Sequence, residues 1–333
     1  MTIRERLEAQ ERETLSPFAM LSSETKGRER PVSADDMRTE FQRDRDRILH
    51  CKSFRRLKGK TQVFLSPQGD HYRTRLTHTL EVSRLARTVT RALALNEDLA
   101  EAASLGHDLG HTPFGHAGER ALNSIYPGGF KHYEQSLRVV DVLERDGRGL
   151  NLCYETRMGI LHHTYGSPDD TREATVVRLC DRIAYINHDL DDAMRAGIIA
   201  PEDVPALIRE RCGERNSERI NSLVSDLIAN STEGVIKMSP EMREVYDFFH
   251  KYMFDAVYHN PLAKGEESKV YGIIEGLYGH YTKHPEDMPE DFRGVMENEG
   301  VERAACDYIS GMTDGYAMEK FGEIFIPFAW TVK

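Results

Sequence analysis

Apolar side chains recur at intervals of three and four residues over most of the chain, which is the spacing of amphipathic α-helices. Between residues 73 and 94 the pattern runs through Leu76, Leu80, Leu85, Val89 and Leu93. Asn96 supplies a polar stop to that helix. Further helices are predicted over residues 38–59, 97–109, 116–125, 134–145, 154–164 and 172–195, and over most of the chain beyond Pro201. The pattern indicates an all-α fold.

One segment departs from helical spacing. Residues 61–65 and the residues around Tyr72 flank the breaker-rich stretch Ser66–Asp70, which predicts a short β-hairpin. Residues 1–37 are polar and predict an N-terminal arm that wraps over the body or over a neighbouring subunit. We expect a helical core over residues 38–200 and a helical C-terminal region over residues 201–333 that packs on it.

Composition narrows the class of protein. The chain has 333 residues, a hydrophobic fraction of 39% and a net charge of −11, and its charged start does not resemble a signal peptide. It contains no apolar run long enough to span a bilayer. Five scattered cysteines without a Cys-x-x-Cys motif argue against a disulfide framework and against a zinc knuckle. We therefore expect a cytoplasmic protein with no membrane association. The acidic balance does not indicate nucleic-acid binding, although residues 43–75 concentrate basic side chains that could attract an anionic ligand.

Four metal-capable residues carry the strongest chemical signal: His78, the adjacent His107 and Asp108, and Asp181. Each lies in a predicted helix, so a helical bundle could bring all four to one point. Imidazole nitrogen and carboxylate oxygen together suit a divalent cation with open positions for water and phosphate. Taken singly, each has a plainer explanation: Asp181 could pair with a neighbouring arginine, and each histidine could be an ordinary core or surface residue. The density of histidines between residues 78 and 116 favours the metal site.

Two further spacings point to the same chemistry. Asp181, Tyr185 and Asp189 stand four residues apart and therefore share one face of a helix. His116 and Glu119 stand three apart at a helix start, where the carboxylate can orient the imidazole as a general acid or base. An ordinary acidic first turn would give the same pair. The dipeptide His162-His163 is interpreted as structural.

The residues also resemble a known family. The motifs are Thr39–Ile48, Phe54–Leu57 with Lys60–Phe64, Arg73–Val82, Gly106–His116, Asp181–Tyr185 and Asp307–Asp314. They are similar to those of the deoxyguanosinetriphosphate triphosphohydrolase family of the HD-domain superfamily, and the resemblance covers most of the chain. It implies an HD-domain helical bundle that carries the short β-hairpin and a helical C-terminal extension.

The resemblance implies a role for each matched residue. His78, His107, Asp108 and Asp181 would hold a divalent metal, Mg²⁺ or Mn²⁺ first and Zn, Fe, Ni or Co as alternatives. His111, His116 and Glu119 would lie over the reacting phosphate. Arg75 would contact the phosphates, Gln62 and Asp189 the sugar 3′-hydroxyl, and Tyr185 the sugar face. The stretch between Asp108 and Asp181 is shorter than in longer members, so the family's preference for guanine is not carried over.

The predicted function is metal-dependent hydrolysis of deoxynucleoside triphosphates, dGTP and possibly other dNTPs, to deoxynucleoside and tripolyphosphate. The resemblance further implies a homo-oligomer and an activating dNTP. Two alternatives stand beside this prediction. One is another HD-type nucleotide phosphohydrolase, a phosphodiesterase or a nucleotidase, which would share the metal ligands but not the sugar-binding residues. The other is a non-catalytic protein that binds nucleotide or nucleic acid, which would have little use for His116 and Glu119.

Overall fold

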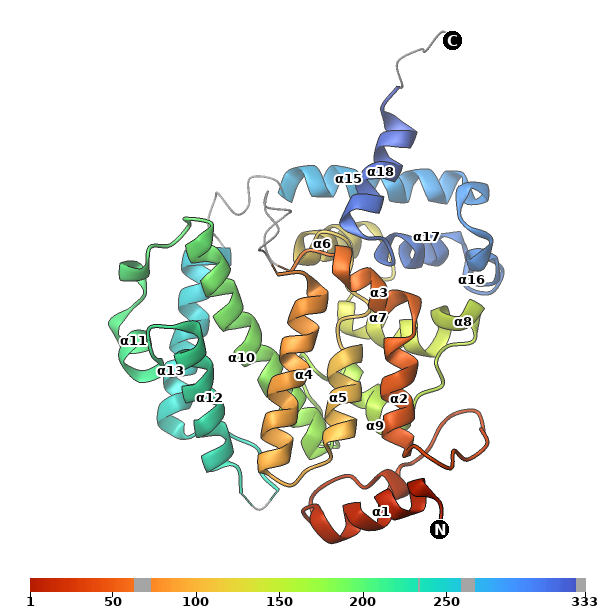
Figure 1. Cartoon of the computed structure of the whole chain (residues 1–333). Coiled ribbons are helices and arrows are strands. Elements are labelled where there is room, and N and C mark those ends of the chain that lie inside the picture. Colours follow the sequence, from red (N-terminus) through yellow and green to blue (C-terminus); the bar gives the residue numbers. More distant parts are fainter. Residues whose placement is uncertain (63–72, 233, 259–266, 328–333) are drawn as a thin grey trace, which may run out of the picture.

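The computed structural model describes residues 1–62, 73–232, 234–258 and 267–327. Within these ranges the chain is helical, and its only extended pairings are isolated bridges, so the all-α prediction is confirmed (Figure 1). The predicted β-hairpin falls mostly on residues 63–72, outside the described residues. Beside it, Thr61 forms an antiparallel bridge with Thr74.

The central helices follow the predicted ranges closely. They are α2 (Glu40–Leu49), α3 (Lys52–Arg56), α4 (Arg75–Ala92), α5 (Glu97–Gly106), α6 (Gly115–Ile125), α7 (His132–Arg138), α8 (Glu144–Gly147), α9 (Tyr154–Leu161) and α10 (Arg172–Arg195). Short turns of other helix types connect some of them, at Leu57–Gly59 and Val139–Leu143.

Two of the helix predictions were wrong. Asn96 begins a helix rather than ending one, because its side chain accepts hydrogen bonds from the backbone N–H groups of Asp98 and Leu99 and so caps α5. Helix α4 already ends at Ala92, and Ala94 turns the chain with a φ of 51°. The predicted helix over residues 38–59 is also interrupted, because Cys51 accepts from the N–H of Phe54 and starts a new helix there.

The C-terminal half forms two groups of helices. Helices α11 (Ala206–Cys212), α12 (Asn216–Asn230) and α13 (Pro240–Met253) lie beside α10. Helices α15 (Glu267–Lys283), α16 (Arg293–Glu299), α17 (Val301–Ser310) and α18 (Asp314–Phe325) form the second group, in which α15 packs on α6 and also contacts α17 and α18 (Figure 1). Separate apolar clusters hold each group, the first around Ile183 and Phe249 and the second around Leu122 and Ile309. Both groups therefore brace helices that carry site residues, while the boundary between residues 200 and 201 stays a prediction.

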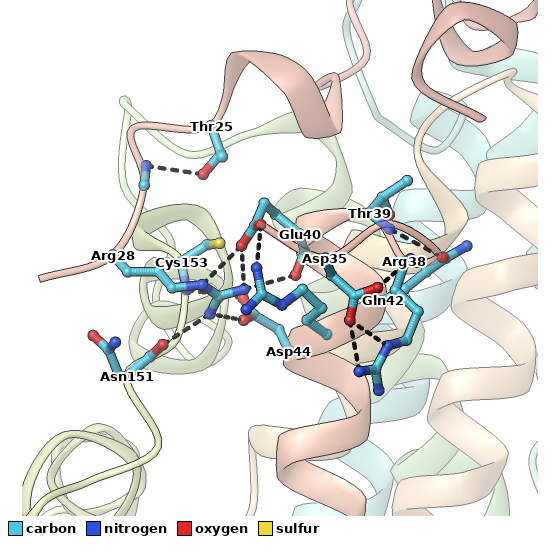
Figure 2. A network of polar contacts seen from close by, with 12 residues as sticks. Thr25, Arg28, Asp35, Arg38, Thr39, Glu40, Gln42, Asp44, Asn151 and Cys153 are labelled. Carbon is cyan, nitrogen blue, oxygen red and sulfur yellow. Dashed lines mark hydrogen bonds and ion pairs between the residues drawn. The ribbon is translucent and has the colours of Figure 1, made fainter. Parts of the chain in front are cut away.

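The N-terminal arm packs on its own chain. It contains α1 (Ile3–Thr14), and Figure 2 shows how Arg28 anchors the segment that follows. The Arg28 guanidinium pairs with Glu40 and Asp44 and donates to the backbone oxygen of Asn151 at 2.8 Å. Because the Arg28 side chain is only 4% exposed, these ion pairs replace the water it loses on burial. The arm is thus fixed against α2 and the segment before α9.

Candidate metal centre and active site

The four predicted metal ligands meet where α4, α5 and α10 pack together. Helix α4 supplies His78, the turn directly after α5 supplies His107 and Asp108, and α10 supplies Asp181. His78 Nε2 lies 3.0 Å from Asp181 Oδ1, and His107 Nε2 lies 3.6 Å from the same oxygen. Ligand atoms held by one ion at about 2.1 Å stand about 3 Å apart, so this spacing suits a single cation.

The state of His107 supports that assignment. Its Nδ1 donates to the backbone oxygen of Ser104 at 2.6 Å, which leaves Nε2 as the ligand atom. This Nε2 is buried and has no hydrogen-bond partner among the described residues. Burial alone would lower the pKa of His107, but the charges of Asp108 and Asp181 outweigh it and raise that pKa to about 9. A site that attracts a proton so strongly also attracts a cation, so the donor set fits a divalent metal.

A cavity of about 690 Å³ opens beside this cluster. Its wall includes every predicted metal, catalytic and substrate-binding residue except His107. The other lining residues are Phe114, Ala117, Arg120, His132, His163, Thr164, Tyr165, Arg182, Arg243, Tyr246, Asp247, His250, Phe254, Val257 and Tyr258. The volume is that of a site for a nucleotide-sized ligand.

Arg75 brings a fixed positive charge to the cavity. It is the first residue of α4 and only 2% exposed, and its guanidinium donates to Asp108 Oδ2 at 2.7 Å. A second nitrogen donates to the backbone oxygen of Gln62 at 3.3 Å. Within the described part of the chain, Arg75 Nε and Gln62 Oε1 are buried without a partner. Both atoms are available to a polar ligand.

The loop before α6 is held by the C-terminal region. Asp314 accepts from the N–H of Phe114 at 2.8 Å and from the N–H of Thr61 at 2.9 Å. The buried Lys60 donates to the backbone oxygens of His111 and Ser310. Phe114 has a φ of 63°, a conformation that a bulky side chain adopts only when its surroundings fix it. These contacts explain how residues 307–314 contribute to a site from which they are distant in sequence.

His116 and Glu119 form the pair that their spacing predicts. His116 Nδ1 lies 3.2 Å from Glu119 Oε2, and the His116 side chain is 61% exposed at the cavity rim. Glu119 also accepts from His132, through the backbone N–H and through Nδ1, each at 3.0 Å. Burial would raise the pKa of Glu119, but these imidazoles hold it well below its usual range. His111 stacks on His132, and burial next to Arg75 keeps its pKa well below the ordinary value.

The far side of the cavity is aromatic. Tyr185 and Asp189 follow Asp181 along α10 and turn toward the π-helical segment Phe254–Tyr258. Tyr258 donates to Asp189 Oδ2 at 2.5 Å. Burial raises the pKa of Asp189 to about 8. This wall combines apolar rings with a buried polar group, as a sugar and a base require.

Comparison with known proteins gives the family. The HD domain family matches residues 75–186, and the phosphohydrolase-associated domain matches residues 236–323. A deoxyguanosinetriphosphate triphosphohydrolase-like protein from Caldanaerobacter subterraneus subsp. tengcongensis is 51% identical over 99% of this chain and 98% of its own length. The chain belongs to the deoxyguanosinetriphosphate triphosphohydrolase-like family. Proteins of the same name from Clostridium perfringens and Desulfatibacillum aliphaticivorans are 49% and 46% identical, each over 98% of this chain and at least 98% of their own.

Membership of this family makes the protein a hydrolase with a metal-binding HD domain, and the HD match spans all four candidate ligands. A solved structure of a hypothetical protein from Aquifex aeolicus aligns with 85% of this chain and 71% of that chain, at 19% identity and a TM-score of 0.47. No helix in the described ranges has the length and apolarity needed to cross a membrane.

The cavity residues that the sequence analysis did not assign to the site include His132, His163 and Tyr258. The dipeptide His162-His163 was interpreted as structural, yet its two members have different surroundings. His162 pairs with Asp170 at 2.5 Å, and the cavity lining does not include it. His163 faces the cavity, with its ring centroid 5.0 Å from that of His107. The sequence shows only that histidines are frequent in this part of the chain. That frequency does not distinguish His163, which lines the cavity, from His162, which does not.

Proposed function

We propose that this protein hydrolyses deoxynucleoside triphosphates to deoxynucleoside and inorganic tripolyphosphate. The observation that carries the proposal is the arrangement of one cavity. Metal ligands, a buried arginine and an imidazole–carboxylate pair line one part of it, and Tyr185, Asp189 and Tyr258 line another. A triphosphate on the first part would place its sugar against the second. The names of the relatives, which refer to deoxyguanosine triphosphate, support the same substrate class.

His78, His107, Asp108 and Asp181 would hold the cation, which when bound supplies Lewis-acid stabilisation of charge on the phosphate. Mg²⁺ and Mn²⁺ are our first assignments. Arg75 would neutralise further phosphate charge, since it is buried and fixed by Asp108. Gln62 would bind the sugar 3′-hydroxyl through its unpartnered Oε1 together with Asp189.

Cleavage breaks the bond between the α-phosphorus and the nucleoside 5′-oxygen, and water supplies the oxygen that replaces it. We assign His116 as the proton donor to the departing 5′-oxygen. Glu119 accepts from His116 Nδ1, which leaves Nε2 to exchange a proton with the substrate, and the exposed ring regains its proton from solvent. His111 is buried and neutral, so it serves as a hydrogen-bond partner to the phosphate rather than as an acid.

Tyr185 would cover the sugar face and leave little room for a 2′-hydroxyl. This arrangement favours deoxynucleotides over ribonucleotides. The test is a panel of dNTPs and rNTPs with Mn²⁺ or Mg²⁺, with products separated by ion chromatography. We expect tripolyphosphate and deoxynucleoside from dNTPs and little turnover of rNTPs. Pyrophosphate or single phosphate as the product would instead identify a phosphodiesterase-like or nucleotidase-like enzyme, and binding without turnover would identify a nucleotide-binding protein.

We also propose a homo-oligomer that an additional dNTP activates. The support is an apolar surface on α18, where Met318, Phe325 and Ile326 are exposed. Residues 328–330, which the sequence analysis also assigned to this apolar end, lie outside the described residues. Light scattering across a range of dNTP concentrations tests the proposal. A monomer with hyperbolic kinetics on a single dNTP would contradict it.

A further inference from the structure

A carboxylate outside the cavity connects two of the cavity walls. Asp314, the first residue of α18, is 5% exposed and is not among the described residues that line the cavity. Its Oδ1 accepts from the backbone N–H of Phe114 at 2.8 Å, and its Oδ2 accepts from that of Thr61 at 2.9 Å. Thr61 directly precedes Gln62, which lines the cavity. Phe114 lies two residues before His116, which lines it as well. One side chain therefore ties the wall that carries Gln62 to the wall that carries His116.

A second side chain joins the same segments. Lys60 is 2% exposed, and its ammonium group donates to the backbone oxygen of His111 and, at 2.8 Å, to that of Ser310. Ser310 is the last residue of α17, so the end of α17 and the start of α18 both contribute to the connection. Hydrogen bonds of charged groups are the stronger ones in proteins, and burial removes the competition of water. The contacts of Lys60 and Asp314 are therefore strong connections rather than surface pairs.

The loop that carries Phe114 has a conformation that needs support. Phe114 and Gly115 have φ values of 63° and 57°, in the left-handed region that residues with a side chain rarely adopt. Gly115 lies against the other wall, where a Cβ at its position would be 3.2 Å from the backbone oxygen of Gln62. Because the two walls approach each other this closely, a shift of either segment changes the position of His116 relative to Gln62.

The substrate gives this relative position its importance. In the function proposed above, Gln62 binds the sugar 3′-hydroxyl and His116 protonates the 5′-oxygen. Both oxygens belong to one deoxyribose, which holds them within a narrow range of separations. The protein must hold the two side chains at a matching separation, since a displacement of about 1 Å can lower a rate by roughly 10²-fold. We propose that Asp314 is a positioning residue that sets the separation of Gln62 and His116. Its effect on catalysis rests on the proposed function, whereas the connection between the two walls does not.

A plainer role for Asp314 is stabilisation of α18, since a carboxylate in the first turn interacts favourably with the helix dipole. The hydrogen bonds at this helix start are divided between two residues. Thr313 caps α18 by accepting from the N–H of Tyr316 at 3.3 Å, whereas the two Asp314 oxygens accept from Phe114 and Thr61. Thr313→Ala is therefore the matched control, because it removes the cap and leaves the bridging carboxylate in place.

The first measurement is amide hydrogen exchange, followed by mass spectrometry, and it needs no substrate. We expect faster exchange at the amides of Thr61 and Phe114 in Asp314→Ala, and wild-type rates at both in Thr313→Ala. Asp314→Asn should be intermediate, because its side chain keeps one acceptor oxygen, and it replaces Asp314→Ala if that variant does not fold. Unchanged exchange at either amide in the folded Asp314 variants would overturn the proposal, whether or not the protein hydrolyses dNTPs.

The second measurement compares hydrolysis of dATP with that of 2′,3′-dideoxyadenosine triphosphate, which lacks the 3′-hydroxyl. The wild type should prefer dATP, because the bound hydroxyl places the 5′-oxygen next to His116. Asp314→Ala should lower kcat on dATP by roughly 10 to 10²-fold and kcat on the dideoxy analogue much less, so the preference for dATP shrinks. Thr313→Ala should keep the wild-type preference.

The two measurements together separate failure of the proposal from failure of the proposed function. An equal loss of kcat on both nucleotides in Asp314→Ala would overturn the proposal, because Asp314 would then support the fold in general. So would the same loss of preference in Thr313→Ala. Equal rates of the wild type on the two nucleotides would overturn both the proposal and the role given to Gln62. If the wild type hydrolyses neither nucleotide while Asp314→Ala accelerates exchange at both amides, the proposed function is wrong and the connection through Asp314 is supported.

Discussion

Replacement of His116 by alanine separates catalysis from structure at this site. The His116 side chain is 61% exposed and makes one described hydrogen bond, to Glu119 at 3.2 Å. An exposed pair of this kind contributes less than about 1 kcal/mol to stability. If His116 protonates the leaving oxygen, its loss should lower kcat by roughly 10² to 10⁴-fold, which corresponds to about 3–5 kcal/mol of transition-state stabilisation. The predicted effect on kcat therefore far exceeds the effect on folding.

Glu119→Ala should affect stability and catalysis by similar amounts. Its carboxylate is only 13% exposed and accepts from the His132 backbone N–H as well as from two imidazoles. Removing it leaves a buried donor unpaired, which costs about 1–3 kcal/mol of stability. Because His116 keeps its chemical group and loses only its orientation, kcat should fall by about 10 to 100-fold. Glu119→Gln should recover stability more than activity, since the amide oxygen still accepts from His132.

The assay combines tripolyphosphate release with thermal unfolding and bound metal on the same samples. His284→Ala is the matched control, because His284 is 54% exposed and pairs with Glu286 at 3.4 Å, and its kcat should equal that of the wild type. The reasoning is refuted if His116→Ala keeps more than about a tenth of wild-type kcat. It is also refuted if the variant loses metal while its rate per bound metal stays normal, because His116 would then be a ligand.

Three further predictions concern the metal, the sugar and the buried carboxyl. Asp108→Asn should abolish turnover with helical circular dichroism near wild type, as should chelator treatment of the wild type, whereas full activity after verified removal of metal would contradict the metal assignment. Tyr185→Ala should erode the preference for dATP over ATP more than it weakens dATP binding, as measured by kcat/KM for both; equal hydrolysis of the two by the wild type would exclude the role given to this ring. Because burial raises the pKa of Asp189 to about 8, the folded chain retains a proton that the unfolded chain releases near pH 4. The free energy of unfolding should therefore fall as pH rises from about 4 to about 8, and Asp189→Asn should flatten that slope in denaturant titrations. Parallel slopes for the variant and the wild type would show that Asp189 does not titrate in this way.

Helical periodicity was sufficient to predict most of the fold. The helix over residues 172–195 was placed at its observed bounds, because its apolar positions face the core along its whole length. Asn96 was misassigned because an asparagine between two helices can cap either one. Which it caps depends on the φ of Ala94 and on two backbone N–H groups, and neither is visible in a residue pattern.

The candidate site, like the fold, could be predicted from the sequence only in part. His78, His107, Asp108 and Asp181 were predictable because each stands in a helix or directly after one, at a spacing that a bundle can bring together, and the structure does so. The predicted helix over residues 97–109 ends at Gly106, so His107 and Asp108 lie in the turn that follows α5. The place of His163 in the cavity wall was not predictable, because it depends on how α9 packs against α7. Sequence gives the type of a ligand, while its tautomer and direction require the packed structure.

The central claim is that a metal-dependent site cleaves a deoxynucleoside triphosphate at the α-phosphorus. The most direct measurement is hydrolysis of a dNTP in ¹⁸O-labelled water by the Mn²⁺-loaded protein, with mass analysis of both products. We predict that the label enters tripolyphosphate and that the deoxynucleoside carries none. Label in the deoxynucleoside, or a product set of pyrophosphate and deoxynucleoside monophosphate, would contradict the account.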